Sequence, residues 1–311
     1  MISVVVVNWN SGPFLEKCVA SLLGCASGCE IVVVDNASED HSMDFLASIR
    51  PAPILIRNAS NLGFAAANNA GWNRSSGDPV LFLNPDVECT EGAVDDLRQA
   101  LASDSSVWAC AGRLNSASAP GRIEHSVRRL PNLAGVAAEM LLLDEAWPGN
   151  PWTAHYRMRG ENLGSVREVE QPAAACLMFR RSALEATGGF DESFRPAWFE
   201  DVDLCKRVRD AGGRILFHPS AQFRHHGGYT LDKLSYAKFL EYYHSNQIRY
   251  FAKHHGPRRA RQVRRLVVAG MRARAVLSIL RPFAKGFTRG QSFRIFANAA
   301  RYFKQTGGDA S

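Results

Sequence analysis

Residues 1–10 read MISVVVVNWN, an apolar run of β-branched side chains that ends in two asparagines. Two further runs, IVVV at 31–34 and VLFL at 80–83, are followed directly by Asp or Asn. Short continuous runs of this kind are typical of strands buried on both faces of a parallel sheet. The intervening segments 13–23 and 64–73 have helical character. This order predicts an α/β fold with a Rossmann-like, mostly parallel sheet flanked by helices.

Charge divides the 311-residue chain into two parts. Residues 1–230 contain 20 Lys and Arg and 27 Asp and Glu, whereas residues 231–311 contain 17 and 3. This shift predicts a domain over 1–230 and a basic, helical C-terminal region over 231–311. A composition of 46% hydrophobic and 22% charged residues excludes fibrous and wholly disordered classes. Because no run approaches the ~18 apolar residues of a membrane span and the N-terminus lacks a basic signal region, we expect a cytoplasmic protein.

Polar side chains follow each of the three apolar runs. They are Asn8, Asn10, Asp35, Asn36, Asn84 and Asp86. Ligands of parallel sheets bind beyond the carboxyl ends of the strands, where Asn and Asp can read a base and a ribose. Asp86 is also a candidate ligand for a divalent cation that bridges a diphosphate. For each cluster taken alone, helix capping and turn formation remain the alternative.

A stretch rich in small residues, NLGFAAANN, occupies 61–69 and contains Asn61, Gly63 and Asn68. Small residues let a backbone approach a ligand closely, and a helix N-terminus favours phosphate. The sequence has no GxGxxG after the first run and no GxxxxGK[ST] at any position. These absences weaken the interpretations as a dinucleotide oxidoreductase or a P-loop protein.

The segment FEDVD at 199–203 places Glu200, Asp201 and Asp203 at the start of an expected helix. Three carboxylates this close are costly unless a cation or a proton offsets them, and one can act as a general base. An acidic helix N-terminus that only complements the helix dipole is the alternative. Further along, His225 and His226 precede two glycines, and a neutral imidazole there can complete a metal site. A surface histidine pair is the alternative for that motif.

These segments together resemble glycosyltransferase family 2, the inverting transferases of GT-A fold. The resemblance rests on VVVVNWNS, VVVDNAS, NLGFAAANN, LNPDV, AAACLMFRR, FEDVDLCKR and HHGGYT, which follow the order of the family and cover roughly residues 1–230. The LNPDV and FEDVDL segments are most similar to the rhamnosyltransferase branch, which uses dTDP-L-rhamnose. The resemblance therefore implies transfer of a sugar from a nucleotide-sugar donor to a hydroxyl of a glycan or a polyprenyl-diphosphate-linked acceptor, in cell-wall or polysaccharide synthesis.

The resemblance also implies a role for each matching residue. Asp201 corresponds to the catalytic base, with Glu200 and Asp203 as a supporting acidic cluster. Asp86 corresponds to the second Asp of the DxD metal motif, and Asn84 replaces the first, so the strength of binding to Mg²⁺ or Mn²⁺ is open. His225 is the expected histidine on the metal side, from its spacing to Gly228 and Thr230, with His226 as the alternative. The donor-binding residues implied are Asn8, Asn10, Asp35, Asn36, Asn61, Gly63, Asn68 and Asn84.

The basic C-terminal region predicts an amphipathic helix over 258–274, with Arg258, Arg261, Arg265 and Arg272 on one side. The next segment, 275–287, adds the apolar residues Val276, Leu277, Ile279, Leu280 and Phe283, with Pro282 bending or ending the helix. Basic and apolar faces together favour peripheral contact with the inner face of the cell membrane. A solvated basic helix that packs on the catalytic domain is the alternative. Two other function classes remain, a catalytically inactive nucleotide-sugar-binding module and a nucleic-acid-binding protein that uses the arginines. We expect no nucleic-acid partner, because 1–230 is acidic and lacks the aromatic and basic pattern of RNA-binding sheets.

Overall fold

The computed structural model describes residues 1–26, 28–119, 121–227, 234–283 and 286–306, which form two compact units. The first, here called the sheet unit, comprises Met1–Leu130 and Glu161–Lys233, and the second, the helical unit, comprises Pro131–Gly160 and Leu234–Ser311. The sequence placed 131–160 with the sheet, whereas in the structure this segment belongs to the helical unit. The predicted functional boundary at 230/231 lies outside the described residues and stays a prediction.

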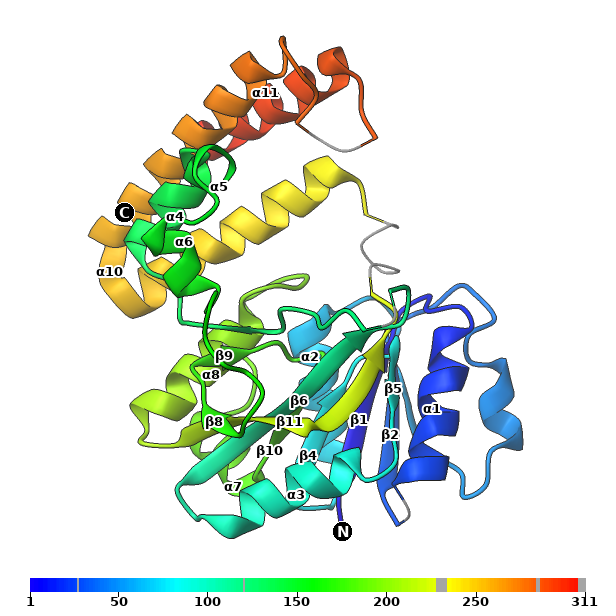
Figure 1. The fold of residues 1–311 in the computed structure, drawn as a ribbon. Helices are drawn as coiled ribbons and strands as arrows, with labels where there is room; N and C mark the ends of the chain where they lie inside the picture. The colour runs from blue at the N-terminus through cyan, green and yellow to red at the C-terminus, as the bar shows by residue number, and fades with distance from the viewer. Residues whose placement is uncertain (27, 120, 228–233, 284–285, 307–311) are drawn as a thin grey trace. The chain divides into compact units, whose positions relative to one another are not determined.

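Within the described residues, nine strands form one mixed sheet in the sheet unit (Figure 1). Its order is β3 (Ile54–Arg57), β2 (Glu30–Asp35), β1 (Ser3–Asn8), β4 (Val80–Leu83), β10 (Cys176–Phe179), β6 (Val107–Ser116), β11 (Arg214–His225) and β5 (Val87–Cys89), with β8 (Arg167–Glu168) paired to β11. The strands β5, β8 and β10 run antiparallel to their neighbours, and the other six share one direction. A separate ladder pairs β7 (Val127–Arg128) with β9 (Gln171–Pro172). The predicted mostly parallel sheet is confirmed.

Helices cover both faces of this sheet. On one face, Val4 and Val6 share a buried core with α1 (Phe14–Cys25) and α3 (Ala93–Ser103). Because neighbouring side chains of a strand point to opposite faces, Val5 meets α2 (Phe64–Arg74) on the other. There α2 approaches so closely that a Cβ added at Gly71 would lie 2.3 Å from Val5 Cγ1. The remaining helices of the sheet unit are η1 (Asp44–Ser48), α7 (Arg181–Thr187) and α8 (Glu200–Asp210).

The helical unit consists of α4 (Leu133–Met140), α5 (Leu143–Ala146), α6 (Pro151–Tyr156), α10 (Tyr236–Leu277) and α11 (Arg289–Gln305) (Figure 1). Its longest helix, α10, is interrupted at Gly256, whose backbone leaves the helical region at φ 81° just before Pro257. The predicted helix over 258–274 is the second half of α10. Its apolar side chains Val263 and Val267 are fully buried, and Arg258 and Arg272 are exposed. Among the described residues, no helix combines the length and apolarity needed to cross a bilayer.

Candidate active site

The ends of β1 and β2 bring the first predicted donor-binding residues together. In the parallel ladder Asn8 lies beside Asp35, and both side chains are buried. The Asn8 amide donates to Asp35 Oδ1 at 3.0 Å and to Ser38 Oγ at 2.9 Å. Asn10 Oδ1 accepts the backbone N–H of Glu39 at 2.7 Å, so it ties the two strand-end loops to each other. The hydrogen bonds of these two amides hold the loops at the carboxyl ends of β1 and β2 in place. They also fix the position of the Asp35 carboxylate.

A second network of amides joins the loop after β2 to the start of α2. Buried Asn36 donates from Nδ2 to Asn61 Oδ1 at 2.9 Å and to the carbonyl of Gly63 at 3.2 Å. Gly63 has φ 89°, and a Cβ there would lie 2.8 Å from the carbonyl oxygen of Pro196, so only glycine fits. Asn68 donates to the carbonyl of Phe64 within α2 at 2.9 Å. The loop that the sequence assigned to the donor is therefore held rigidly from inside.

Asp86, which follows β4, lies next to the histidine at the end of β11. His225 Nε2 is 3.4 Å from Asp86 Oδ2, and His225 Nδ1 is 2.6 Å from Glu124 Oε2. Burial lowers the pKa of His225, but its hydrogen bonds and charge interactions with Asp86 and Glu124 outweigh this effect and raise the pKa to about 9. The imidazole is thus oriented by one carboxylate toward the other.

The neighbouring His226 points elsewhere. Its Nε2 lies 2.5 Å from Glu88 Oε1, and its ring packs against Phe14 with centroids 4.8 Å apart. Only its backbone N–H bonds to Asp86, through the carbonyl oxygen at 2.9 Å. Of the two histidines that the sequence left open, His225 is the one whose ring faces Asp86. Gly228 and Thr230, which supported that choice, lie outside the described residues.

Asp201 sits in the first turn of α8 and is half-buried. Its Oδ1 accepts the N–H of Val202 at 2.8 Å, and its Oδ2 accepts the N–H of Ala174 at 3.2 Å. Burial raises the pKa of the Asp201 carboxyl, while the two backbone hydrogen bonds and the charge of Arg128 oppose the rise. A carboxylate with a raised pKa is a stronger base, as proton abstraction from a hydroxyl requires.

The other two carboxylates of this segment have separate environments. Asp203 is fully buried and accepts a hydrogen bond from Arg207 Nε at 2.8 Å. The same guanidinium donates to the carbonyl of Thr187 at 2.5 Å, which fastens α8 to the end of α7. Glu200 is 5% exposed, and its Oε2 has no hydrogen-bond partner among the described residues. Burial and the charge of Asp201 raise the pKa of Glu200 well above its usual range.

Backbone contacts connect Asp201 to the metal-side residues. The N–H of Asn84 donates to the carbonyl of Ala175 at 2.9 Å, one residue after the Ala174 N–H that binds Asp201. From the other direction, the N–H of Ala173 donates to the carbonyl of Ser126, two residues after Glu124. The turn 173–175 therefore joins the base segment to Asn84 and to the loop that orients His225. No motif in the sequence indicates Glu124, because 101 residues separate it from its histidine partner.

Left-handed backbone conformations occur at several points of this region. Trp198 and Phe199, directly before α8, both have φ 73°, and Asn10 and Ala37 at the strand ends have φ 51° and 61°. Such conformations are costly for bulky residues and concentrate at functional sites. Their position before Asp201 and beside Asp35 supports the same location for the site.

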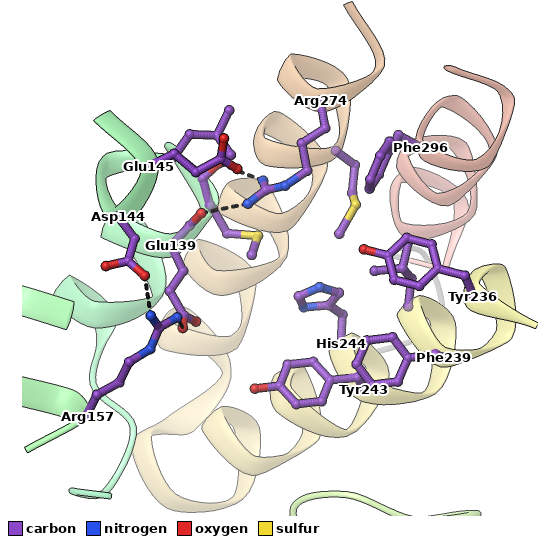
Figure 2. A pocket seen from close by; sticks show the side chains of 14 residues that line it. Glu139, Asp144, Glu145, Arg157, Tyr236, Phe239, Tyr243, His244, Arg274 and Phe296 are labelled. Carbon is purple, nitrogen blue, oxygen red and sulfur yellow. Dashed lines mark hydrogen bonds and ion pairs between the residues drawn. The ribbon is translucent and has the colours of Figure 1, made fainter. Parts of the chain in front are cut away.

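The helical unit contains a pocket of about 390 Å³ (Figure 2). Its lining includes Tyr236, Phe239, Tyr243 and Phe296, together with buried His244. Burial lowers the pKa of His244 to about 4, so this imidazole is neutral at physiological pH. All of the lining residues belong to the helical unit, and none is a predicted site residue.

The chain matches the model of a protein family, glycosyl transferase family 2, over residues 3–188. The chain belongs to this family. It is a glycosyltransferase similar to rhamnosyltransferases, since an N-acetylglucosaminyl-diphospho-decaprenol L-rhamnosyltransferase of Mycobacterium tuberculosis is 33% identical over 272 residues, 82% of this chain and 85% of the relative. A pre-mycofactocin glycosyltransferase of the same organism is 30% identical over 72% of this chain and 42% of its own length.

Two solved structures share the fold of this glycosyltransferase. The mannosyltransferase PcManGT from Pyrobaculum calidifontis, in complex with GDP-Man and Mn²⁺, has a TM-score of 0.56 and 16% identity, over 98% of this chain and 79% of that one. TarS of S. aureus, residues 1–349, has a TM-score of 0.53 and 14% identity, over 98% and 91%. The predicted GT-A fold and the predicted family are confirmed.

The residues around Asp86 suit a divalent cation in part. Asp86 supplies a carboxylate, and His225 supplies a ring nitrogen once metal binding displaces the proton that its raised pKa favours. Among the described residues, however, no group of three His, Cys, Asp or Glu side chains is arranged to hold a metal ion. A cation here would therefore depend on diphosphate oxygens and water for the rest of its coordination.

Proposed function

We propose that this glycosyltransferase transfers L-rhamnose from dTDP-L-rhamnose to a sugar hydroxyl of a polyprenyl-diphosphate-linked acceptor, with inversion at the anomeric carbon. The observation that carries the proposal is the 33% identity to a decaprenol-linked L-rhamnosyltransferase along 85% of that relative. The aligned stretch of 272 residues is longer than the segment 3–188 that matches the family model. It therefore supports more than the shared donor fold.

In the proposed mechanism Asp201 is the general base. The acceptor O–H bond breaks as its proton passes to the carboxylate, the oxygen forms a bond to the anomeric carbon, and the bond from that carbon to the diphosphate oxygen breaks. The nucleoside diphosphate leaves on the opposite face, so a single displacement inverts the configuration. The hydrogen bonds from Ala174 and Val202 hold the carboxylate in place without protonating it. Burial strengthens it as a base.

The proposed donor site lies along the ends of β1, β2 and β4. Asp35 and Asn84 would contact the nucleotide, and the loop from Asn61 to Gly63 would shape the pocket around it. Asn8, Asn10, Asn36 and Asn68 already bond within the protein, so we assign them to holding these loops at the spacing that the donor requires. Asp86 and His225 would hold a divalent cation, which supplies neutralisation of the leaving diphosphate.

The acceptor that we propose is anchored by its lipid, so the enzyme has to work at a membrane surface. We propose a peripheral position on the inner face of the cell membrane, where nucleotide sugars and lipid-linked intermediates meet. The basic C-terminal helices support this position because anionic lipids attract such segments.

The test of the proposed reaction separates chemistry from binding. Asp201→Asn removes the base, so we expect transfer of rhamnose to fall by at least about a hundredfold, while dTDP-L-rhamnose still raises the melting temperature. Asp210→Asn, an exposed acid on the same helix, is the matched control and should retain full activity. Retained transfer in Asp201→Asn would contradict the assigned base. Stabilisation by UDP- or GDP-sugars but not by dTDP-L-rhamnose would contradict the assigned donor.

A further inference from the structure

Among the large apolar side chains that the helical unit exposes, six lie on two segments that are far apart in the sequence. On the first, Leu141, Trp147 and Trp152 are 55%, 54% and 44% exposed. On the second, at the end of α10, Val276, Ile279 and Leu280 are 62%, 61% and 72% exposed. These six residues are here called the docking face. Contiguous exposed apolar groups of this size mark surfaces that contact another body.

Specific contacts join the two segments. The guanidinium of Arg274 donates to the carbonyls of Glu139 and Met140 at 2.8 and 3.0 Å, at the end of α4 (Figure 2). Arg281, directly after Leu280, forms an ion pair with Glu145, two residues before Trp147. The apolar residues on either side of these contacts are therefore held near one another in one unit.

The net charge of the helical unit indicates which kind of partner the docking face can bind. The helical unit contains 18 Lys and Arg and 5 Asp and Glu, a net charge of +13. Three of those acids, at positions 139, 144 and 145, are already paired with arginines. A cationic unit with an apolar face is complementary to an anionic bilayer, and tryptophan side chains favour the interface between lipid and water.

The docking face overlaps only in part with the membrane-contact region that the sequence predicted over 258–287. Val263 and Val267 of that region are fully buried in the helical unit, so they are not available to lipid. The exposed apolar groups begin nine residues after Val267, at Val276, within the predicted apolar segment 275–287. The arginines at 258, 261, 265 and 272 are exposed and add positive charge.

We propose that the docking face inserts into the interfacial region of an anionic lipid bilayer and that the exposed arginines hold it there. This inference rests on the proposed lipid-linked acceptor, because such an acceptor is reached only at a membrane. A bilayer contact of this kind depends on both apolar burial and charge, so it should weaken with added salt and with loss of either component.

The experiment uses the full chain and vesicles that contain neither acceptor nor nucleotide sugar. We expect sedimentation with phosphatidylglycerol vesicles, little binding to phosphatidylcholine vesicles, and release by 0.5 M salt. The double variant Ile279→Asp/Leu280→Asp should weaken partitioning to anionic vesicles by at least about tenfold. Trp147→Ala/Trp152→Ala should do the same through the other segment. Leu55→Asp, an exposed apolar residue of the sheet unit, is the control and should bind as the wild type does.

Both substituted pairs are exposed, and an unchanged melting temperature would show that the variants fold. Anionic vesicle binding that survives both double variants would overturn the proposal. A second outcome would also overturn the proposal. In that outcome the wild type forms a dimer and does not bind vesicles, and Ile279→Asp/Leu280→Asp dissociates the dimer. Transfer of the sugar to a water-soluble acceptor analogue should be the same in the double variants as in the wild type. A wild type that shows no such transfer would contradict the proposed function but not the proposed membrane contact.

Discussion

The ion pairs around His225 predict a loss of stability as pH rises. In the folded state Asp86 and Glu124 raise the pKa of this imidazole from 6.5 to about 9. Because the folded pKa lies above the unfolded one, the charged imidazolium stabilises the fold fully below about pH 6.5. This contribution is lost as pH rises through about 9. A shift of that size corresponds to about 3 kcal/mol of unfolding free energy, at roughly 1.4 kcal/mol for each pKa unit.

The measurement compares the wild type with His225→Gln in urea unfolding at several pH values between 6 and 10. Cysteine, tyrosine and lysine side chains titrate in both proteins, so their effects cancel in the difference. Tryptophan fluorescence reports on the sheet unit through Trp9, Trp72, Trp108 and Trp198. The wild type should lose up to about 3 kcal/mol more than the variant between the two ends of the range.

Glu124→Gln supplies the internal check. It leaves Asp86 as the one remaining carboxylate of the pair that contacts the His225 ring, so the wild-type pH dependence should shrink without vanishing and should shift to lower pH. Parallel pH profiles for the wild type and His225→Gln would refute the reasoning, since they would show that His225 has the same pKa in the folded and unfolded states.

Further predictions concern packing, burial and the metal side of the site. Gly71→Ala should lower the free energy of unfolding by about 1–3 kcal/mol, because its Cβ would overlap the side chain of Val5. Gly24→Ala, in an open part of α1, should be neutral or stabilising, and urea unfolding measures both variants. Glu200→Gln should be more stable than the wild type, by a margin in melting temperature that grows from pH 5 to pH 8, because burial opposes ionisation of this carboxyl. Asp86→Asn should abolish any thermal shift that Mn²⁺ gives with the nucleotide sugar, and Glu88→Gln, whose acid pairs with His226, should retain it.

The sequence predicted the central strands well because a strand that is buried on both faces has a continuous run of apolar residues. The runs at 2–7, 31–34 and 80–83 correspond to β1, β2 and β4, and the predicted helices at 13–23 and 64–73 correspond to α1 and α2. The edge strand β3 was missed, since only alternate residues of its ILIR sequence are half-buried. In β11 only 215–217 forms a continuous buried run, and its later half alternates between buried and exposed residues after Pro219, so the full strand was not predicted.

The segment 131–160 shows how helix-start residues can resemble loop residues. Its asparagines, prolines and glycines are residue types common in loops. Asn132 and Asn150 are nevertheless helix N-caps, whose side chains accept the N–H groups of Gly135 and Thr153 at 2.8 and 3.0 Å. Pro151 occupies the first turn of α6, where its missing N–H costs nothing. The helices are short, and α4 packs on α10, which lies about a hundred residues later. Helices this short show no clear helical repeat of apolar residues, so their sequence alone does not predict them.

The acidic segment 200–203 also shows that the sequence alone does not distinguish residues whose surroundings differ in the fold. As a sequence, Glu200, Asp201 and Asp203 are three equivalent carboxylates, and a resemblance to a family is what singled out Asp201. In the structure their surroundings differ, because successive positions on a helix face different directions. Asp203 is neutralised by Arg207, whereas burial and the charge of Asp201 raise the pKa of Glu200 and favour its protonated form. Asp201 alone is held by two backbone N–H groups while remaining half-buried. A base has to be both oriented and reachable by the acceptor, and of the three carboxylates only Asp201 meets both conditions.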